Sequence, residues 1–184
     1  MKKFLGIKLT LVLFFCLTSV INAQTTDVLG WQEAKWNMSE QELLDTFKPK
    51  ITKLDKRKIL SDDYGYEDYA ILDYEIEGNK FTVYFDMDNT TKKLKRVQLR
   101  LNEGESLISK DSLYFPLYES LLTRKYGTPS FKNDDRKPRM VVLKRQWIFK
   151  TTTIELRYVW SSMGNFSWLT IMYFPSQAGD INKV

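Results

Sequence analysis

Paired carboxylates are the residues of this sequence whose types and spacing could support catalysis. The pairs are Asp62 with Asp63, Asp73 with Glu75, and Asp134 with Asp135. Two carboxyl groups facing each other across a cleft can hydrolyse a glycosidic bond, one as the acid and the other as base or nucleophile. Adjacent acids are also typical of a solvated surface, and no apolar segment beside them is placed to hold a carboxyl group protonated. A carboxylate-dependent hydrolase acting on a glycan or cell-wall substrate is therefore the alternative function, and no catalytic residue is assigned.

Histidine is absent from the sequence, and Cys16 is its only cysteine. This composition excludes Ser-His-Asp and Cys-His catalysis and leaves no histidine for zinc, copper or haem. The segment 86–90 has oxygen ligands at calcium-like spacing, but it lacks the glycine and the distant glutamate of an EF-hand loop. Aspartate and asparagine are also ordinary residues of a hairpin turn. We expect no metal, no cofactor and a protein that is not an enzyme.

Aromatic residues make up 14% of the chain, and most fall on the predicted core phase of a strand. A few tyrosines lie instead on the polar phase of a strand or in a predicted loop, and two arginines share the polar strand face with one of them. The candidate binding residues are Tyr64, Tyr66, Tyr84, Arg96 and Arg100. Tyrosine and arginine are enriched in protein-binding surfaces, although long side chains also cover solvated sheet faces. We expect a protein or an envelope ligand to bind through a sheet face or through a loop at 48–69.

The first 23 residues have the pattern of a secretory signal peptide. A basic start at Lys2 and Lys3 precedes an apolar segment, 9–20, and the pattern ends on Ala23. The apolar segment is too short to span a bilayer comfortably, so we expect cleavage and no stable transmembrane segment afterwards. A retained membrane anchor is one alternative. A lipoprotein is another, but two phenylalanines precede Cys16 where small residues are required. The sequence therefore predicts a periplasmic or secreted protein.

Cleavage of the leader changes what the composition implies. The remaining chain has no cysteine and cannot form a disulfide, but about 160 residues bury enough apolar surface to fold without one. Three lysines and no acidic residue lie in the leader, so the formal charge falls from +5 to +2 on its removal. With so small a positive charge and an export signal, nucleic acid is not an expected partner. We expect one domain at 24–176 and a flexible tail at 177–184.

Ser39 is predicted to begin a helix. Its hydroxyl can accept from the first turn, and Glu42 can reach back to the Ser39 amide, which completes a capping box. Pro49 ends this helix. A second helix is predicted over 112–126, where Gly127 is a suitable residue to follow its last turn. The charged segment 131–139 is interpreted as a loop.

Alternating apolar residues predict three strands after each helix. A turn at Gly78-Asn79 would place Tyr74 opposite Val83. The third strand is expected to carry a bulge near Lys95, because Leu94 is out of phase with the residues that follow. The last strand, 166–174, is apolar on both phases and is therefore expected to be central and covered on both faces.

The order of these elements predicts an α+β fold with an internal duplication. Two helix-plus-three-strand meander units, 36–103 and 108–175, would form an antiparallel sheet with the helices packed on one face. The pattern repeats between the halves, whereas individual residues do not match.

Two short motifs carry a resemblance to known proteins. Trp36-Asn37-Met38-Ser39 resembles the W-G-M-S helix start of small exported bacterial domains, with asparagine in place of glycine, and the helix exit Tyr126-Gly127 followed by Pro129 recurs there. The layout is similar to the duplicated beta-lactamase-inhibitor-protein-like fold, which includes outer-membrane assembly lipoproteins. The resemblance implies a fold and no catalytic residues.

Overall fold

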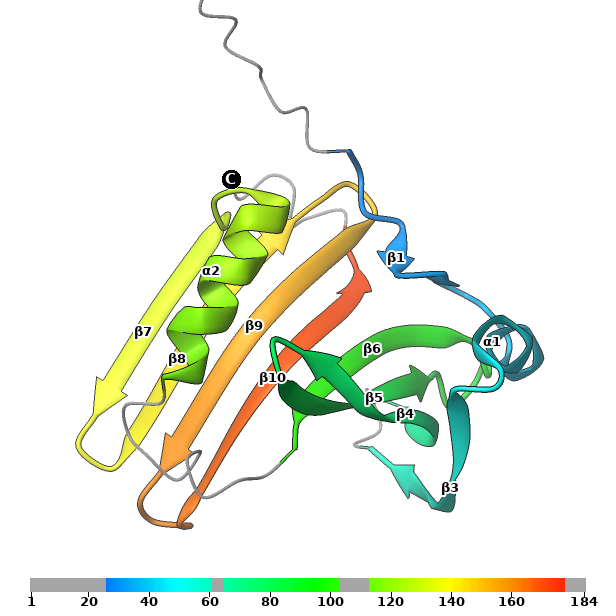
Figure 1. The fold of residues 1–184 in the computed structure, drawn as a ribbon, viewed down its shortest axis with the longest axis horizontal. Coiled ribbons are helices and arrows are strands. Elements are labelled where there is room, and N and C mark those ends of the chain that lie inside the picture. Colours follow the sequence, from blue (N-terminus) through cyan, green and yellow to red (C-terminus); the bar gives the residue numbers. More distant parts are fainter. Residues whose placement is uncertain (1–25, 61–64, 103–112, 178–184) are drawn as a thin grey trace, which may run out of the picture.

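A computed structural model of the chain describes residues 26–60, 65–102 and 113–177. The predicted leader, the pair Asp62-Asp63, Tyr64 and the tail beyond residue 177 lie outside these ranges. Two helices and ten strands are present in the described part (Figure 1). Their bounds are β1 Gly30–Trp31, β2 Ala34–Lys35, α1 Glu40–Phe47, β3 Ile51–Ile59, β4 Tyr66–Ile76, β5 Asn79–Met87, β6 Leu94–Leu101, α2 Tyr114–Tyr126, β7 Phe131–Lys137, β8 Met140–Ile148, β9 Thr152–Ser161 and β10 Phe166–Pro175.

Strands β3 to β10 form one eight-stranded antiparallel sheet, and β1 pairs with β2 in a separate small sheet. The order across the large sheet is β3-β4-β5-β6-β10-β9-β8-β7. Two four-stranded meanders therefore meet where β6 pairs with β10. The predicted antiparallel sheet is confirmed, and so is the central place of the last strand.

The predicted fold class is wrong. The part of the chain that the structure describes is mostly β, with 57% of its residues in strands and two short helices, and it is not a pair of helix-plus-three-strand units with helices packed on a sheet. Each helix is followed by four strands, because β3 and β7 occupy segments that were expected to be loops. Both are edge strands of the large sheet. Their charged side chains protect the edges of the sheet from pairing with other chains. Because these segments are so charged, they lack the apolar alternation that predicts a strand.

The capping box at the start of α1 is confirmed. The Glu42 amide donates to Ser39 Oγ at 3.3 Å, and the Ser39 amide donates to Glu42 Oε2 at 2.7 Å. Two of the amides that a helix start leaves without partners are thereby satisfied. The helix ends at Phe47, before the proline that was expected to stop it.

The hairpin between β4 and β5 turns one residue earlier than predicted. Glu77 and Gly78 form the turn with positive φ angles of 50° and 75°, and Tyr74 lies opposite Phe81 rather than Val83. A bulge at Leu72-Asp73 shifts the register, and it turns Leu72 outward to 52% exposure. The bulge predicted in β6 is confirmed, since Lys95 is an extra residue between two paired positions.

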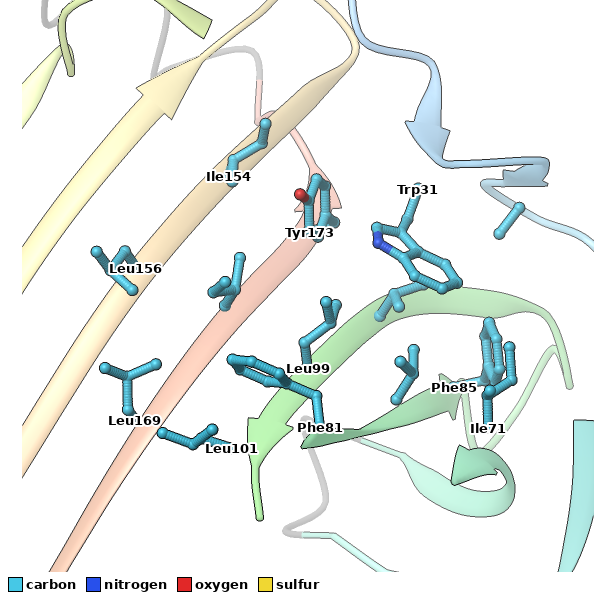
Figure 2. Packing of buried hydrophobic residues seen from close by; sticks show 14 of the residues in the cluster. Trp31, Ile71, Phe81, Phe85, Leu99, Leu101, Ile154, Leu156, Leu169 and Tyr173 are labelled. Atoms are coloured by element: carbon cyan, nitrogen blue, oxygen red, sulfur yellow. The ribbon is translucent and has the colours of Figure 1, made fainter. Parts of the chain in front are cut away.

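The two phases of β5 define the two faces of the sheet. Phe85 packs against Phe47 of α1 and Phe81 packs against Tyr118 of α2, each with ring centroids 5.2 Å apart. We call this side the apolar face. Figure 1 shows α2 lying over β8 and β9, and Figure 2 shows buried side chains of the core, including Phe81, Phe85, Leu99 and Tyr173. Tyr84 has the opposite phase and points to the other side, the open face, which neither described helix covers.

Candidate functional site

Strand pairing extends the open face across the middle of the sheet. Gln98 on β6 lies opposite Tyr84 on one side and opposite Met172 of β10 on the other. Met172 lies opposite Glu155 of β9, which in turn faces Gln146 of β8. Residues directly opposite one another in antiparallel strands point to the same side. This row, and every second residue before and after it on each strand, therefore forms one surface.

A groove with a volume of about 1110 Å³ lies on the open face. Its cationic lining residues are Lys58, Lys95, Arg96, Arg100, Lys144 and Arg157. Its floor follows β10, where Trp168, Thr170, Met172 and Phe174 alternate with buried residues. We call these six cations and four floor residues, with the space between them, the open-face groove. An apolar floor bordered by cations is suited to a ligand that has both apolar and anionic groups.

Three carboxylates lie beneath the cations of the groove. Glu67, Asp86 and Glu155 are 0%, 0% and 5% exposed, respectively. Glu67 pairs with Arg100 and with Lys58, whose Nζ lies 3.8 Å from it. A buried carboxylate requires such partners, because an unpaired buried charge is costly. The cations consequently lie at the surface of the groove, while the carboxylates are buried behind them.

Glu155 is held in the same manner on the other half of the sheet. Lys144 Nζ lies 2.9 Å from its carboxylate, and Gln146 Nε2 donates to it at 2.7 Å. Arg157, two residues along β9, is exposed and has no ion-pair partner among the residues described. Its guanidinium group is available to an outside anion.

Asp86 is a buried carboxylate with only one oxygen hydrogen-bonded. Its Oδ2 accepts from Arg96 and from Gln98 Nε2, the latter at 2.5 Å, whereas its Oδ1 has no partner in the described part of the chain. Burial raises the pKa of Asp86 to about 6; the charge of Arg96 lowers it and that of Glu67 raises it. Desolvation outweighs the cation here because half of the carboxylate is uncompensated.

Three of the predicted binding residues lie together on the open face. Arg96 and Arg100 line the groove, and the Arg100 guanidinium lies 4.2 Å from the centroid of the Tyr84 ring. This cation–π contact turns Arg100 away from β10 and toward β5. Tyr84 therefore supports a cation of the groove.

Tyr66 lies elsewhere, on the apolar face, and is 1% exposed. Its hydroxyl donates to Glu40 of α1 at 2.6 Å, and Arg57 lies 4.3 Å from its ring centroid. Burial and then Glu40 raise the pKa of Tyr66, so the hydroxyl stays protonated and links β4 to the helix. The expected 48–69 loop is instead strand β3 and the start of β4, apart from residues 61–64, which are not described.

Several residues of the groove were not predicted as site residues. Lys58 was placed in a loop, and Lys144, Arg157 and Trp168 belong to the second half of the chain, to which no site was assigned. The signal that could have identified them is the last strand. Its second apolar phase, which includes Trp168 and Met172, is expected from the sequence to be covered, whereas no described element covers it and Trp168 is 44% exposed.

Neither of the two candidate carboxylate pairs that the structure describes is assembled for catalysis. Asp73 is exposed and lies 3.5 Å from Lys80. Asp134 pairs with Arg145 at 2.5 Å, whereas Asp135 pairs with Lys137 at 2.9 Å. Neighbouring residues on a strand point to opposite faces, so these two acids cannot act on one substrate atom.

The segment 86–90 comprises the last two residues of β5 and the start of the turn that follows it. Asp88 Oδ1 accepts from the amides of Thr90 and Thr91 at 3.0 and 2.8 Å. These two backbone hydrogen bonds, with that of Thr91 the stronger, lower the pKa of Asp88 to about 2. No cluster of three potential metal-ligating side chains occurs within the ranges that the structure describes.

Comparisons with family models, with curated proteins and with solved structures find no match for this chain. Within residues 26–60, 65–102 and 113–177, neither helix has the length and apolar character needed to cross a bilayer.

Proposed function

We propose that this protein is an exported, non-enzymatic envelope domain that binds a protein or an envelope ligand through the open-face groove. The observation that carries the proposal is the apolar floor on a central strand. Trp168 is 44% exposed, and Met172 and Phe174 are partly exposed beside it. Apolar side chains in the middle of a sheet normally face a covering layer. Here no described element of the chain provides one.

The charges around the floor indicate the character of the ligand. Six cations line the groove, and the three carboxylates of the same face are enclosed beneath them. Charge complementarity between surfaces selects partners and raises association rates. A ligand with anionic groups beside an apolar surface satisfies both features of the groove.

Export is supported by the leader-like pattern of residues 1–23, with its basic start and apolar segment. An envelope location also suits a domain without cysteine, because the domain has no thiol that an oxidising compartment could modify. The ligand is accordingly sought among envelope components.

The hydrolase alternative is favoured by one pair of acids, Glu67 and Asp86, which lie directly opposite each other on β4 and β5. Both side chains are fully buried, with Arg100 and Arg96 bonded to them. A catalytic carboxylate must reach the bond that it protonates or attacks. Because these two acids are enclosed, the binding function has the stronger support.

Affinity capture from envelope extract tests the proposal. Immobilised protein is compared with the double variant Arg157→Glu, Trp168→Ala, in which both residues are exposed and neither supports a buried acid. The matched control is Lys53→Glu, an exposed charge reversal on β3 outside the groove. We expect the double variant to lose components that the wild type and the control retain. Identical captured components from all three proteins would refute the groove as the binding site.

A further inference from the structure

The floor of the open-face groove is a single row of side chains. Trp168, Thr170, Met172 and Phe174 are successive open-face residues of β10. At about 3.4 Å per residue, the line from Trp168 to Phe174 is about 20 Å long. The floor is thus long and narrow, with three apolar side chains and one hydroxyl along one strand.

Cations border this line on both sides. Thr170 lies opposite Arg100 on β6 and opposite Arg157 on β9, and Arg157 lies opposite Lys144 on β8. The Arg100 guanidinium lies over Tyr84, which is one strand further from the floor. Three strand spacings separate β5 from β9, so the two cationic borders are about 14 Å apart.

We propose that the open-face groove binds an amphipathic α-helix of a partner protein, with its apolar stripe on β10 and acidic residues on both flanks. This inference rests on the proposed function and specifies its ligand. A helix with side chains is about 10–12 Å wide, which fits between the cationic borders. About 20 Å of floor corresponds to about 13 residues of helix, or nearly four turns.

The chemistry of the face favours a helix over an extended peptide. The strands beneath the groove are paired on both sides, so the groove offers side chains and no backbone groups to a ligand. An extended peptide adds to a sheet through its backbone at an edge, whereas a helix satisfies its own backbone and binds through side chains.

The shape of the face favours a helix over a bilayer. The floor and its borders form a hollow of about 1110 Å³, a concave shape that matches a rod-like ligand better than a flat membrane surface. The partner helix is expected to carry apolar residues at intervals of three and four, with aspartate or glutamate next to this stripe on each side.

The test uses the protein obtained from the full chain and a synthetic peptide as the probe. The peptide has about 18 residues, a leucine stripe, glutamates on both flanks and alanines elsewhere, with a side-chain cross-link that holds it helical. A second peptide has lysine in place of each glutamate. A third has the composition of the first in an order without a stripe. Binding of labelled peptide is followed by fluorescence anisotropy.

We expect saturable binding of the acidic helix and at least about tenfold weaker binding of the other two peptides, since about 1.4 kcal/mol corresponds to tenfold in affinity. Arg157→Glu and Trp168→Ala should each weaken binding, whereas Lys53→Glu should not. Added salt should weaken the interaction through the flanking charges.

Equal binding of all three peptides, or none, would overturn the inference. Binding of phosphatidylglycerol vesicles that depends on Arg157 and Trp168, without binding of the acidic helix, would assign the groove to lipid and also overturn it. If the acidic helix fails while the groove variant still loses envelope components, the proposed function stands and only the helix is wrong. If both experiments fail, the groove is not the binding site.

Discussion

Glu67 and Asp86 lie directly opposite each other on β4 and β5, and both side chains are fully buried. Arg100 pairs with the first and Arg96 with the second. The two carboxylates thus support cations of the open-face groove from beneath. The same arginines therefore have two roles. They neutralise the buried carboxylates, which contributes to the free energy of unfolding, and they place positive charge at the surface of the groove.

Asp86→Asn should change the pH dependence of stability. The pKa of Asp86 is raised by burial to about 6 in the folded state, against 3.8 when unfolded. Its contribution to the free energy of unfolding is therefore present below pH 3.8 and is lost as pH rises through about 6. A shift of about two units corresponds to about 3 kcal/mol.

Urea unfolding of wild type and Asp86→Asn from pH 2 to pH 7 measures this contribution. The wild type should lose stability relative to the variant as pH rises. Asp88→Asn is the control, because the pKa of Asp88 is lowered to about 2 and its contribution has the opposite sign, being lost as pH falls below about 4. Parallel curves for wild type and Asp86→Asn would contradict the raised pKa.

Two arginines of the groove should differ in their effect on stability. Arg100→Ala removes the main partner of the buried Glu67, and we expect a loss of about 2–4 kcal/mol in the free energy of unfolding. Arg157→Ala removes an exposed side chain without an ion-pair partner in the described structure, and it should change stability by less than about 0.5 kcal/mol. Denaturant unfolding at pH 7 distinguishes them. Equal losses would show that the predicted support of Glu67 by Arg100 is wrong.

Arg145 should fix helix α2 to the strands beneath it. It donates to Glu119 of α2 at 2.8 Å and to Asp134 of β7 at 2.5 Å, and its side chain is 9% exposed. Arg145→Ala should cost about 2 kcal/mol, less than for a fully buried pair because both acids are partly exposed.

The pH dependence of Arg145→Ala gives a second readout. Burial raises the pKa of Glu119, but the hydrogen bonds from Arg145 and Lys132 together outweigh burial, so that the pKa lies below its ordinary value. The hydrogen bond from Arg145 also lowers the pKa of Asp134. Their contribution is present above pH 4.5 and is lost as pH falls. The variant should therefore lose less stability than the wild type between pH 5 and pH 2. An identical acid-induced loss in both proteins would contradict the pairing.

Local sequence patterns could predict the features that depend on local chemistry. Ser39 and Glu42 identify the start of α1 because the capping box involves only neighbouring residues. Lys95 was recognised as a bulge from the change of phase in one strand. Apolar residues on both phases of 166–174 predicted a central strand.

The features that depend on strand order could not be predicted. β3 and β7 look like loops because an exposed edge strand needs no apolar alternation. The groove exists because β6 pairs with β10, which brings Arg100 opposite Thr170 from 70 residues away along the chain. Tyr66 was assigned to a binding loop because no signal marked the strand that places its ring against α1.

Site-specific photocrosslinking in living cells tests directly whether a partner binds in the open-face groove. A photoreactive benzoylphenylalanine is introduced at three positions, as Trp168→benzoylphenylalanine on the groove floor and as the same substitution at Lys53 and at Leu72 outside it. We expect a discrete adduct from position 168 alone, which Arg157→Glu greatly reduces while Arg157→Lys retains it. Adducts of equal yield from all three positions, or an adduct at position 168 that is unaffected by Arg157→Glu, would contradict binding in the open-face groove.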